Sequence, residues 1–323
     1  AALYFTGSKA HNIRLRQLAL GRGWTLNEYG LTEGEGGRVL AAAAEEEIYA
    51  ALGLHWIPPE LREDAGEIEL ATAGALPRLL EESDLRGDLH VHTDLSGDGR
   101  ESLEAMVAAA AARGYEYLAI PEHGEDLATN GVSRQQLLAQ RARLQELREQ
   151  YPAMALLHGV ELNIGRHGEV DYDPEFLAGF DWAVAGVHAH FELDRARQTQ
   201  RLLAAMENPA VRAIAHPSGR RLGFRPGIEF DLEAVLAAAE ATGTALEINC
   251  HLDRLDVSTE VLRACRGRKV VLLVDTDAHA ARELANTGFG VRHARRGWVS
   301  PEQVANTRPR DEFLAWARQK RGA

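Results

Sequence analysis

Seven short apolar segments of this chain each end in a side chain that can bind a metal ion, and this pattern limits the possible folds strongly. The segments span residues 87–92, 117–123, 155–161, 182–188, 213–216, 245–249 and 270–279. Helical stretches separate them, as parallel strands require. Because the carboxyl ends of parallel barrel strands meet at one face, the pattern predicts an α/β fold: a closed barrel whose strand ends converge on one metal site.

Composition sets wider limits on the class of protein. A length of 323 residues predicts two domains, or one large domain with an appendage. No apolar run approaches the ~20 residues of a membrane span, and there is no basic-then-apolar leader. The two cysteines, Cys250 and Cys265, cannot form a disulfide framework. We therefore expect a cytoplasmic protein with no membrane partner, and the sequence leaves its oligomeric state open.

The charge distribution limits the kinds of partner that the chain can bind. The net charge of −12 by itself argues against nucleic acid, but Lys and Arg gather at both ends of the chain around an acidic middle. Divalent cations would offset part of that acidity locally.

The chain divides into three parts. Residues 1–65 form a small unit, residues 66–86 are expected to be a linker with a short acidic helix, and strands alternate with helices from residue 87 to 323. Within the small unit we expect helices over 12–20 and 45–52, a strand over 24–29 and a hairpin at 34–37. Later helices are expected over 102–113, 133–151 and 232–242, the second beginning with a Ser133-x-x-Gln136 capping box.

The strand-end residues have the spacing of metal ligands. His90 and His92 are alternate residues on one strand and face the same side, and Asp277 and His279 repeat that spacing. Taken singly, each has an ordinary alternative: the first pair as surface histidines, Asp277 as a helix N-cap. Together the candidates are six histidines and three carboxylates: His90, His92, Asp98, His123, Glu161, His188, His216, Asp277 and His279.

Nine nitrogen and oxygen ligands are too many for one ion and suit two or three. Imidazole with carboxylate fits Zn, Mn or Fe, and ions ~3.5–4 Å apart activate water and bind both oxygens in a phosphoryl displacement. One carboxylate must bridge, and Glu161 is our choice because it lies midway among the strands. Arg220 and Arg254 are candidates to bind a substrate phosphate, with surface salt bridges as the equal alternative.

These residues resemble the polymerase-and-histidinol-phosphatase (PHP) family over about 87–300. The motifs are Gly87-Asp-Leu-His-Val-His-Thr93, Ile120-Pro-Glu-His123, Gly159-Val-Glu161, Gly186-Val-His188, Ala215-His-Pro-Ser-Gly-Arg220, Leu246-Glu-Ile-Asn249 and Asp277-Ala-His279. The resemblance implies a distorted seven-stranded barrel with a trinuclear phosphoesterase site.

The family pattern divides the ligands among three ions. It implies one ion at His90, His92, Glu161 and Asp277, a second at Glu161, His188 and His216, and a third at Asp98, His123 and His279. It assigns no metal to Asn249.

Three positions depart from the pattern or compete with it. Glu122 stands, after Pro121, where the family usually has Asp. The turn before Asp98 is one residue longer, which makes Asp94 a rival ligand. His190 is a spare candidate with a solvent-facing alternative.

The first 65 residues resemble the thumb of family X DNA polymerases, through Leu3-Tyr-Phe-Thr-Gly-Ser8, Asn12, Arg16 and Asn27-Glu-Tyr29. The resemblance implies that Tyr4 and Phe5, followed by Gly7, line the nucleotide sugar pocket, that Asn12 contacts the incoming base, and that Arg16 contacts the template. An aromatic core plug is the alternative for Tyr4-Phe5. Residues 290–298 also match bacterial family X polymerases that carry a C-terminal PHP domain.

The resemblance predicts the C-terminal part of a DNA repair polymerase. Its palm carboxylates, which hold Mg, are not in these 323 residues, so we expect dNTP binding only with that palm and no polymerase activity from this chain. We expect a metal-dependent 3′–5′ exonuclease on DNA, with two to three Mn or Zn ions and with Glu161 and Arg220 as catalytic residues. The alternatives are a small-molecule phosphatase of the histidinol-phosphatase type, and a catalytically weak metal-stabilised scaffold.

Overall fold

The computed structural model describes residues 1–319, which form two compact units, Ala1–Leu79 and the chain from Leu80 onward. In the first unit α1 (Ala2–Thr6) and α2 (Lys9–Leu20) precede a three-stranded antiparallel sheet, followed by α3 (Glu45–Ala51), the 3-10 turn η1 (Pro59–Leu61) and α4 (Glu67–Ala73). The sheet has the order β1 (Thr25–Asn27), β2 (Gly30–Thr32), β3 (Val39–Ala41).

The strand expected over 24–29 ends early. The Asn27 side chain accepts hydrogen bonds from the backbone N–H groups of Tyr29 and Gly30, at 2.9 and 3.2 Å. Such a turn competes with continued strand pairing. The chain therefore reverses at residues 28–29 and pairs back as β2.

Residues 66–86, expected to be a linker with a short acidic helix, contain helix α4 and divide between the two units. Helix α4 belongs to the first unit, because Glu67 and Ile68 are buried there and the backbone N–H of His55 donates to the carbonyl of Ala71 at 3.0 Å. From Leu80 the chain belongs to the second unit, where the N–H of Leu80 donates to the carbonyl of Val299 at 3.0 Å.

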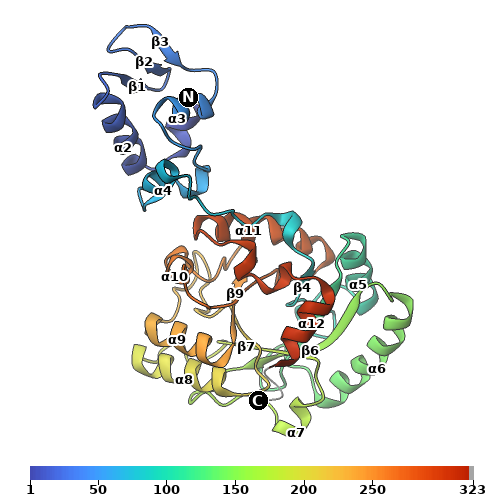
Figure 1. Ribbon diagram of the computed structural model, residues 1–323. Coiled ribbons are helices and arrows are strands. Elements are labelled where there is room, and N and C mark those ends of the chain that lie inside the picture. Colours follow the sequence, from blue (N-terminus) through green and yellow to red (C-terminus); the bar gives the residue numbers. More distant parts are fainter. Residues whose placement is uncertain (320–323) are drawn as a thin grey trace. The chain divides into compact units, whose positions relative to one another are not determined.

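The second unit is a nearly closed parallel barrel, which confirms the predicted fold class (Figure 1). Its seven strands lie in the order of the chain, and the ends of the row approach each other: Val91 pairs with Ala278 in a parallel bridge. The strands are β4 (Gly87–Asp88), β5 (Tyr117–His123), β6 (Ala155–Asn163), β7 (Trp182–Gly186), β8 (Ala213–Ala215), β9 (Ala245–Asn249) and β10 (Leu272–Asp275).

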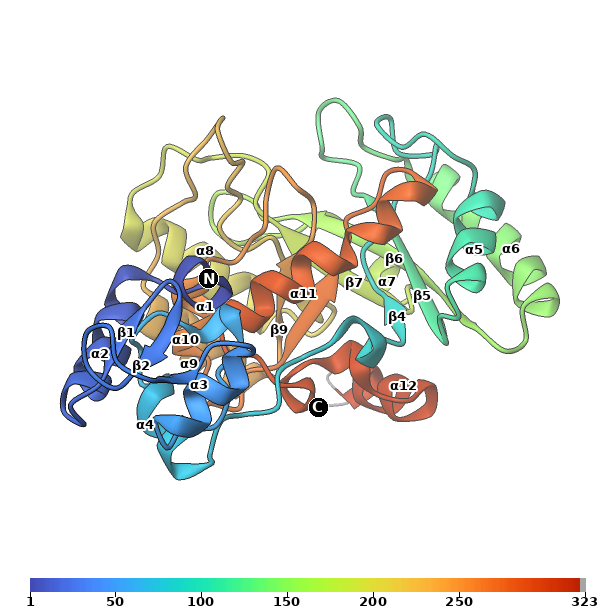
Figure 2. The ribbon, with the colours of Figure 1, turned by 90° about the horizontal axis from the view of Figure 1, so that it is seen from above.

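Helices lie around the outside of the strands (Figures 1 and 2). The expected capping box is present, since the Ser133 hydroxyl accepts from the N–H of Gln136 and the Gln136 side chain accepts from the N–H of Ser133. Helical segments of this unit are α5 (Leu103–Ala112), α6 (Arg134–Gln150), α7 (Pro174–Leu177), α8 (Arg195–Glu207), α9 (Leu232–Thr242), α10 (Thr259–Ala264), α11 (Thr287–Arg296), α12 (Arg310–Gln319) and the 3-10 turns η2 (Glu82–Asp84), η3 (Ala281–Asn286), η4 (Pro301–Gln303) and η5 (Ala305–Thr307).

An aromatic plug fills the amino-terminal end of the barrel. Tyr117 and Trp182 are the first residues of β5 and β7, and both contact Phe313 of α12, with ring centroids 4.2 and 5.8 Å away. Trp316 extends this buried cluster. Alternate residues along a strand face the same side. Tyr117 and His123 therefore both face the inside of the barrel, as do Trp182 and His188. Apolar packing thus supports the barrel at one end and leaves its polar side chains at the other.

Within residues 1–319 no helix combines the length and the hydrophobicity needed to cross a membrane.

We predict that Glu67 holds α4 on the first unit in a pH-dependent way. Its Oε1 lies 2.6 Å from His11 Nδ1, and its carboxylate accepts two backbone N–H groups. Burial raises the pKa of Glu67, but the hydrogen bonds from His11 and from the backbone at Ala65 outweigh it and hold that pKa below 4.5. The stabilisation is then present above about pH 4.5 and is lost as the pH falls through the folded-state pKa.

Glu67→Gln should therefore destabilise residues 1–79 by about 1–3 kcal/mol at pH 7, with a smaller difference from the unmodified chain below about pH 4.5. Amide hydrogen exchange of these residues in the full chain measures both. The control is Glu69→Gln, which removes an exposed ion pair with Arg14 and should cost under about 1 kcal/mol. An equal loss at pH 3 and pH 7 would contradict the assignment.

Candidate metal centre

The predicted ligands converge at the carboxyl end of the barrel. Three groups of them place their nitrogen or oxygen atoms within 4.8 Å of one another, and the first two share His92. The groups are His92, His123 and His279; His90, His92 and Asp277; and His90, Glu161 and His216. They come from β5, β6 and the segments that directly follow β4, β8 and β10, as expected for parallel strands that end at one face.

Glu161 lies at the centre of the cluster and is buried. Its Oε1 is 3.0 Å from His188 Nε2 and 2.8 Å from His216 Nε2. Its Oε2 faces three other imidazoles, at 2.8 Å from His123 Nδ1, 3.5 Å from His90 Nε2 and 3.6 Å from His92 Nε2. Each oxygen therefore faces a different set of nitrogens, which is the arrangement a bridging carboxylate needs.

Asp277 stands opposite Glu161 across the first histidine pair. Its Oδ1 lies 3.7 Å from His90 Nε2 and 3.3 Å from His92 Nε2. A cation between the four side chains could contact both imidazoles and both carboxylates.

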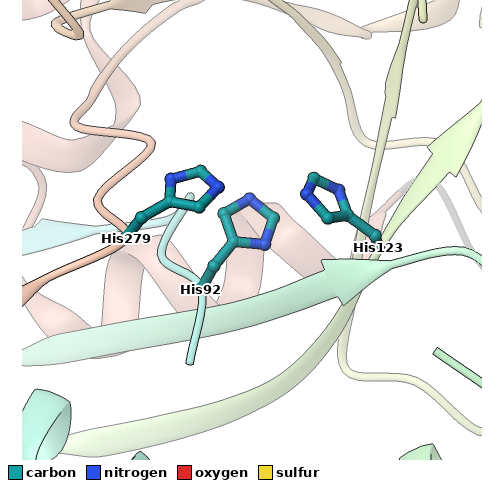
Figure 3. Close-up of side chains that lie close together, drawn as sticks. All are labelled: His92, His123 and His279. Carbon is teal, nitrogen blue, oxygen red and sulfur yellow. The ribbon is translucent and has the colours of Figure 1, made fainter. Parts of the chain in front are cut away.

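Asp98, and not Asp94, is the aspartate that reaches the cluster. Its Oδ1 lies 3.4 Å from His123 Nε2 and 3.5 Å from His279 Nε2, and its Oδ2 accepts from the Asn130 amide at 2.6 Å. In Figure 3 the His92 ring lies between those of His123 and His279; its centroid is 4.2 and 4.5 Å from theirs. Asp94 is exposed and has no contact with these histidines among the described residues.

Several of these atoms are buried without a hydrogen-bond partner. They are Nε2 of His90 and His92, both ring nitrogens of His123, Nδ1 of His216 and Oε2 of Glu161. An unpartnered buried polar atom is costly and calls for a missing ion or water. All of these atoms except His216 Nδ1 face other candidate ligands. The donor set therefore fits divalent cations.

The charges of these side chains point the same way. Burial lowers the pKa of His92 to about 3 and that of His216 to about 4, which leaves both imidazoles neutral near pH 7, the form that binds a metal. Burial also lowers the pKa of His123, but the neighbouring carboxylates of Asp98 and Glu161 outweigh it and raise that pKa to about 10. A proton on His123 thus offsets carboxylate charge that a cation would otherwise neutralise.

Two of the candidate ligands have a left-handed backbone. The φ angles of His216 and Asp277 are 31° and 53°, a region that non-glycine residues rarely occupy. Such strain persists where the surrounding structure enforces it, and it concentrates at functional sites. Here it turns the side chains at the ends of β8 and β10 inward.

Glu247 is a positioning residue that sequence reasoning missed. Its Oε1 lies 2.5 Å from His90 Nδ1, and its Oε2 accepts from the N–H groups of His216 and the Asn249 amide at 2.6 and 3.0 Å. It stands two residues before Asn249 and so shares its inward strand face. The sequence did offer one signal for Glu247, which is an ionisable residue within an otherwise apolar strand segment.

Two amides hold neighbouring ligands. Asn163 Oδ1 lies 2.8 Å from His188 Nδ1, and the Asn249 amide donates to Asp277 Oδ2 at 3.0 Å. Asn249 therefore supports the cluster from behind it.

Glu122 is buried behind the cluster. Its carboxylate accepts from the hydroxyls of Thr93 and Ser96 and from the Gln140 amide, at 2.5, 2.5 and 2.6 Å. Ser96 Oγ in turn lies 3.4 Å from His92 Nδ1. Glu122 consequently orients the loop that carries His92.

The two predicted phosphate-binding arginines differ in position. Arg254 Nε lies 3.2 Å from Asp277 Oδ2, and the side chain lines a cavity of about 360 Å³ above the cluster. Arg220 is not brought there: its guanidinium donates to the carbonyls of Arg254 and Leu255. It holds the loop that presents Arg254. The remaining lining residues are Asp98, Arg100, His123, Arg221, His251, Asp253, Asp277, His279 and Glu283.

His190 points away from the cluster. Its Nδ1 lies 3.4 Å from the Arg166 guanidinium and 3.9 Å from Glu192, and its side chain is partly exposed.

The first unit presents its predicted nucleotide residues near its surface. Phe5 is 75% exposed, so it is no core plug, and its ring centroid lies 5.0 Å from that of Tyr4. The Arg16 guanidinium lies 5.4 Å from the Tyr4 ring. The Asn12 amide donates to the carbonyls of Tyr4, Gly7 and Ser8 at 3.1–3.3 Å and thereby fixes this loop.

Comparison with known proteins agrees with these two units. A family model of the DNA polymerase beta thumb matches residues 1–63, and that of the PHP domain matches residues 88–253. The DNA polymerase/3'-5' exonuclease PolX of Bacillus subtilis (strain 168) is 38% identical over 317 residues, which cover 98% of this chain and 55% of that protein. This chain thus spans about half the length of that relative.

Other matches cover the second unit. A probable phosphatase of Syntrophotalea carbinolica is 29% identical over 230 residues, 68% of this chain and 90% of that protein. The crystal structure of histidinol phosphate phosphatase from Lactococcus lactis, complexed with Zn, L-histidinol and phosphate, has a TM-score of 0.46 at 19% identity and covers 65% of this chain and 93% of that chain. The predicted combination of a thumb with a PHP domain is confirmed.

Gly186 yields a prediction about metal affinity. A Cβ at this position would lie 2.7 Å from His216 Cε1 and 2.9 Å from both Glu161 Oε1 and His188 Cε1. Gly186→Ala should therefore push three candidate ligands apart and weaken Mn²⁺ or Zn²⁺ binding about 10- to 100-fold, as measured by titration calorimetry. Gly288→Ala on α11 is the matched control, because its methyl group would meet only the end of the Glu82 side chain, at 3.2 Å. Equal affinities in both variants would contradict the site.

Proposed function

We infer the function of this chain from its metal-binding side chains and its family, because the chain belongs to the PHP domain family. We propose that it is a metal-dependent phosphoesterase whose substrate is the 3′ end of DNA, which it shortens as a 3′–5′ exonuclease. The observation that carries the proposal is Glu161, whose two oxygens face separate sets of imidazoles.

We assign the ions to the side chains as the family pattern divides them, and the contacts of Glu161 and Asp98 support this division. His90, His92, Glu161 and Asp277 would hold one, Glu161, His188 and His216 a second, and Asp98, His123 and His279 a third. Mn and Zn both suit this donor set. When bound, such ions polarise a phosphoryl oxygen and make a water molecule a stronger nucleophile near neutral pH.

The chain's own residues would bind and orient the phosphate. Arg254 lines the cavity beside Asp277 and can donate to a phosphate oxygen there. His251 lines the same cavity, and its Nδ1 accepts the N–H of Asp253 at 3.3 Å. With Nδ1 as the acceptor, Nε2 is the ring nitrogen that can donate a hydrogen bond to a phosphate oxygen in the cavity.

DNA is the proposed substrate because of the first unit. Its thumb match and its exposed Tyr4 and Phe5 suit a nucleic-acid partner, and a phosphatase of small molecules has no need of them. The PolX relative is named a polymerase and 3'-5' exonuclease. dNTP and Mg would concern only a polymerase palm, and we expect no templated synthesis from these 323 residues. We place the activity in the cytoplasm and in DNA repair.

A phosphatase of small phosphate esters is the second candidate, favoured by the match to a probable phosphatase over 68% of this chain. Comparing release of the terminal nucleotide from 3′-labelled DNA with phosphate release from histidinol phosphate separates the two. Turnover of histidinol phosphate alone would overturn the exonuclease proposal. Metal binding without either activity would indicate a scaffold.

Glu161→Gln should abolish hydrolysis, with a loss of at least about 100-fold in kcat, because an amide cannot present an anionic oxygen to both sets of imidazoles. The assay is release of the 3′ nucleotide from labelled DNA with Mn²⁺. Glu149→Gln, at an exposed position of α6, should keep the full rate. Activity retained in the Glu161 variant would show that the hydrolysis comes from another site or from a contaminant.

Substitutions of Arg254 and of Arg220 should have different effects on the kinetics of hydrolysis. Arg254→Met should lower kcat/KM about 10- to 100-fold, since a charge-assisted hydrogen bond to phosphate contributes about 1.5–3 kcal/mol. Arg220→Lys keeps a charge but cannot donate to two carbonyls at once, so it should lower the melting temperature together with the activity. Arg197→Met at an exposed site on α8 is the control. A phosphate-binding role for Arg220 would instead raise KM without a change in melting temperature.

A further inference from the structure

A short hairpin stands on the loop that follows β8. Arg221 and Arg225 pair as an antiparallel bridge, with backbone hydrogen bonds of 2.9 and 2.8 Å. Leu222, Gly223 and Phe224 form its tip, and the φ of 77° at Gly223 suits glycine. We call residues 221–225 the tip hairpin.

The tip hairpin is fastened at both sides. The N–H of Leu222 donates to the carbonyl of Asp253 at 2.5 Å, and the Arg221 guanidinium lies 2.9 Å from Asp253 Oδ2. At its base the Arg225 guanidinium lies 3.6 Å from the Phe191 ring centroid and donates to the carbonyl of Gly219 at 2.7 Å. The hairpin therefore has a defined conformation.

Despite these contacts the tip leaves its apolar side chains in solvent. Phe224 is 78% exposed, and Leu222 and nearby Leu252 are 44% and 50% exposed. The Arg221 guanidinium lies 5.4 Å from the Phe224 ring centroid. An exposed aromatic ring beside an arginine is the combination on which the bases of single-stranded nucleic acid stack.

The hairpin adjoins the metal cluster through one cavity. Arg221, Asp253 and Arg254 line the cavity whose floor carries His123 and His279. Loops that follow β4 and β5 stand at one side of this end of the barrel, and loops that follow β8 and β9 at the other (Figure 2).

Arg100 lines the same cavity from the loop that follows β4. Its backbone N–H donates to the carbonyl of His279 at 2.9 Å, and among residues 1–319 its guanidinium has no ion-pair partner. A free cation at this position can bind a second phosphate of a strand that enters the cavity.

We propose that the tip hairpin stacks an unpaired base of the substrate on Phe224 while Arg100 binds a neighbouring phosphate, so that the site selects single-stranded 3′ ends. The proposal rests on the proposed hydrolytic function and names its substrate class. To stack singly on Phe224 a base must leave its pair and its stack, which costs least when the end is already single-stranded. A small phosphate ester would occupy the cluster without reaching the hairpin.

The test compares Phe224→Ala, Phe224→Tyr and Phe289→Ala on three substrates: a 3′-labelled single-stranded oligonucleotide, the same end in a blunt duplex, and the p-nitrophenyl ester of thymidine 5′-monophosphate. Phe289, 42% exposed on α11, is the control ring. Phe224→Ala should raise KM for the single strand at least about fivefold, with little change for the ester. Phe224→Tyr should restore the unmodified KM, and the unmodified chain should prefer the single strand to the duplex.

Arg100→Met should also raise KM for the single strand and should reduce the salt dependence of its binding. An unchanged KM in Phe224→Ala, or an equal loss on the ester, would overturn the assignment of the hairpin while leaving the hydrolytic function intact. If the unmodified chain cleaves none of the three substrates, the hydrolytic function fails. Fluorescence anisotropy with a labelled single strand then decides the hairpin separately, since Phe224→Ala must still weaken binding.

Discussion

The buried carboxylate of Glu161 is the interaction on which the barrel's polar end depends. It faces five imidazoles, and a carboxylate in such a place is tolerated only with cationic or hydrogen-bonding partners. Much of the surrounding structure serves this contact. Gly186 leaves the space for it, Glu247 fixes the ring of His90, and the strained backbone of His216 turns that ring inward. Packing and hydrogen bonds would therefore hold the ligands in position before any ion binds.

The barrel can hold this polar cluster because its two ends are chemically different. At the amino-terminal end Trp182 and Tyr117 pack against Phe313, and this largely apolar aromatic cluster supports the strands. The hydrophobic free energy gained at one end can offset the cost of gathering charged side chains at the other. Because alternate residues face inward along each strand, with a period of two, one strand can place an aromatic ring at the first end of the barrel and a candidate ligand at the other.

That period explains what the sequence could predict. Parallel strands and inward alternation suffice to bring His92, His123 and Glu161 together, so the fold class and the convergence of the candidates followed from pattern. Positions fixed by loops or by distant partners did not. Arg220 and Arg254 look alike in sequence, but only the loop conformation directs one to the cavity and the other to backbone carbonyls. Likewise α4 belongs to the first unit through a contact between Glu67 and His11, 56 positions apart.

Both units expose an aromatic ring beside an arginine, although their folds are unrelated. Phe5 lies against Tyr4, over which Arg16 is placed, and Phe224 lies beside Arg221. Large exposed apolar rings commonly mark a surface that a partner covers. In the proposed function the exposed rings of the first unit would contribute affinity for DNA, and Phe224 beside the metal cluster would favour an unpaired 3′ end.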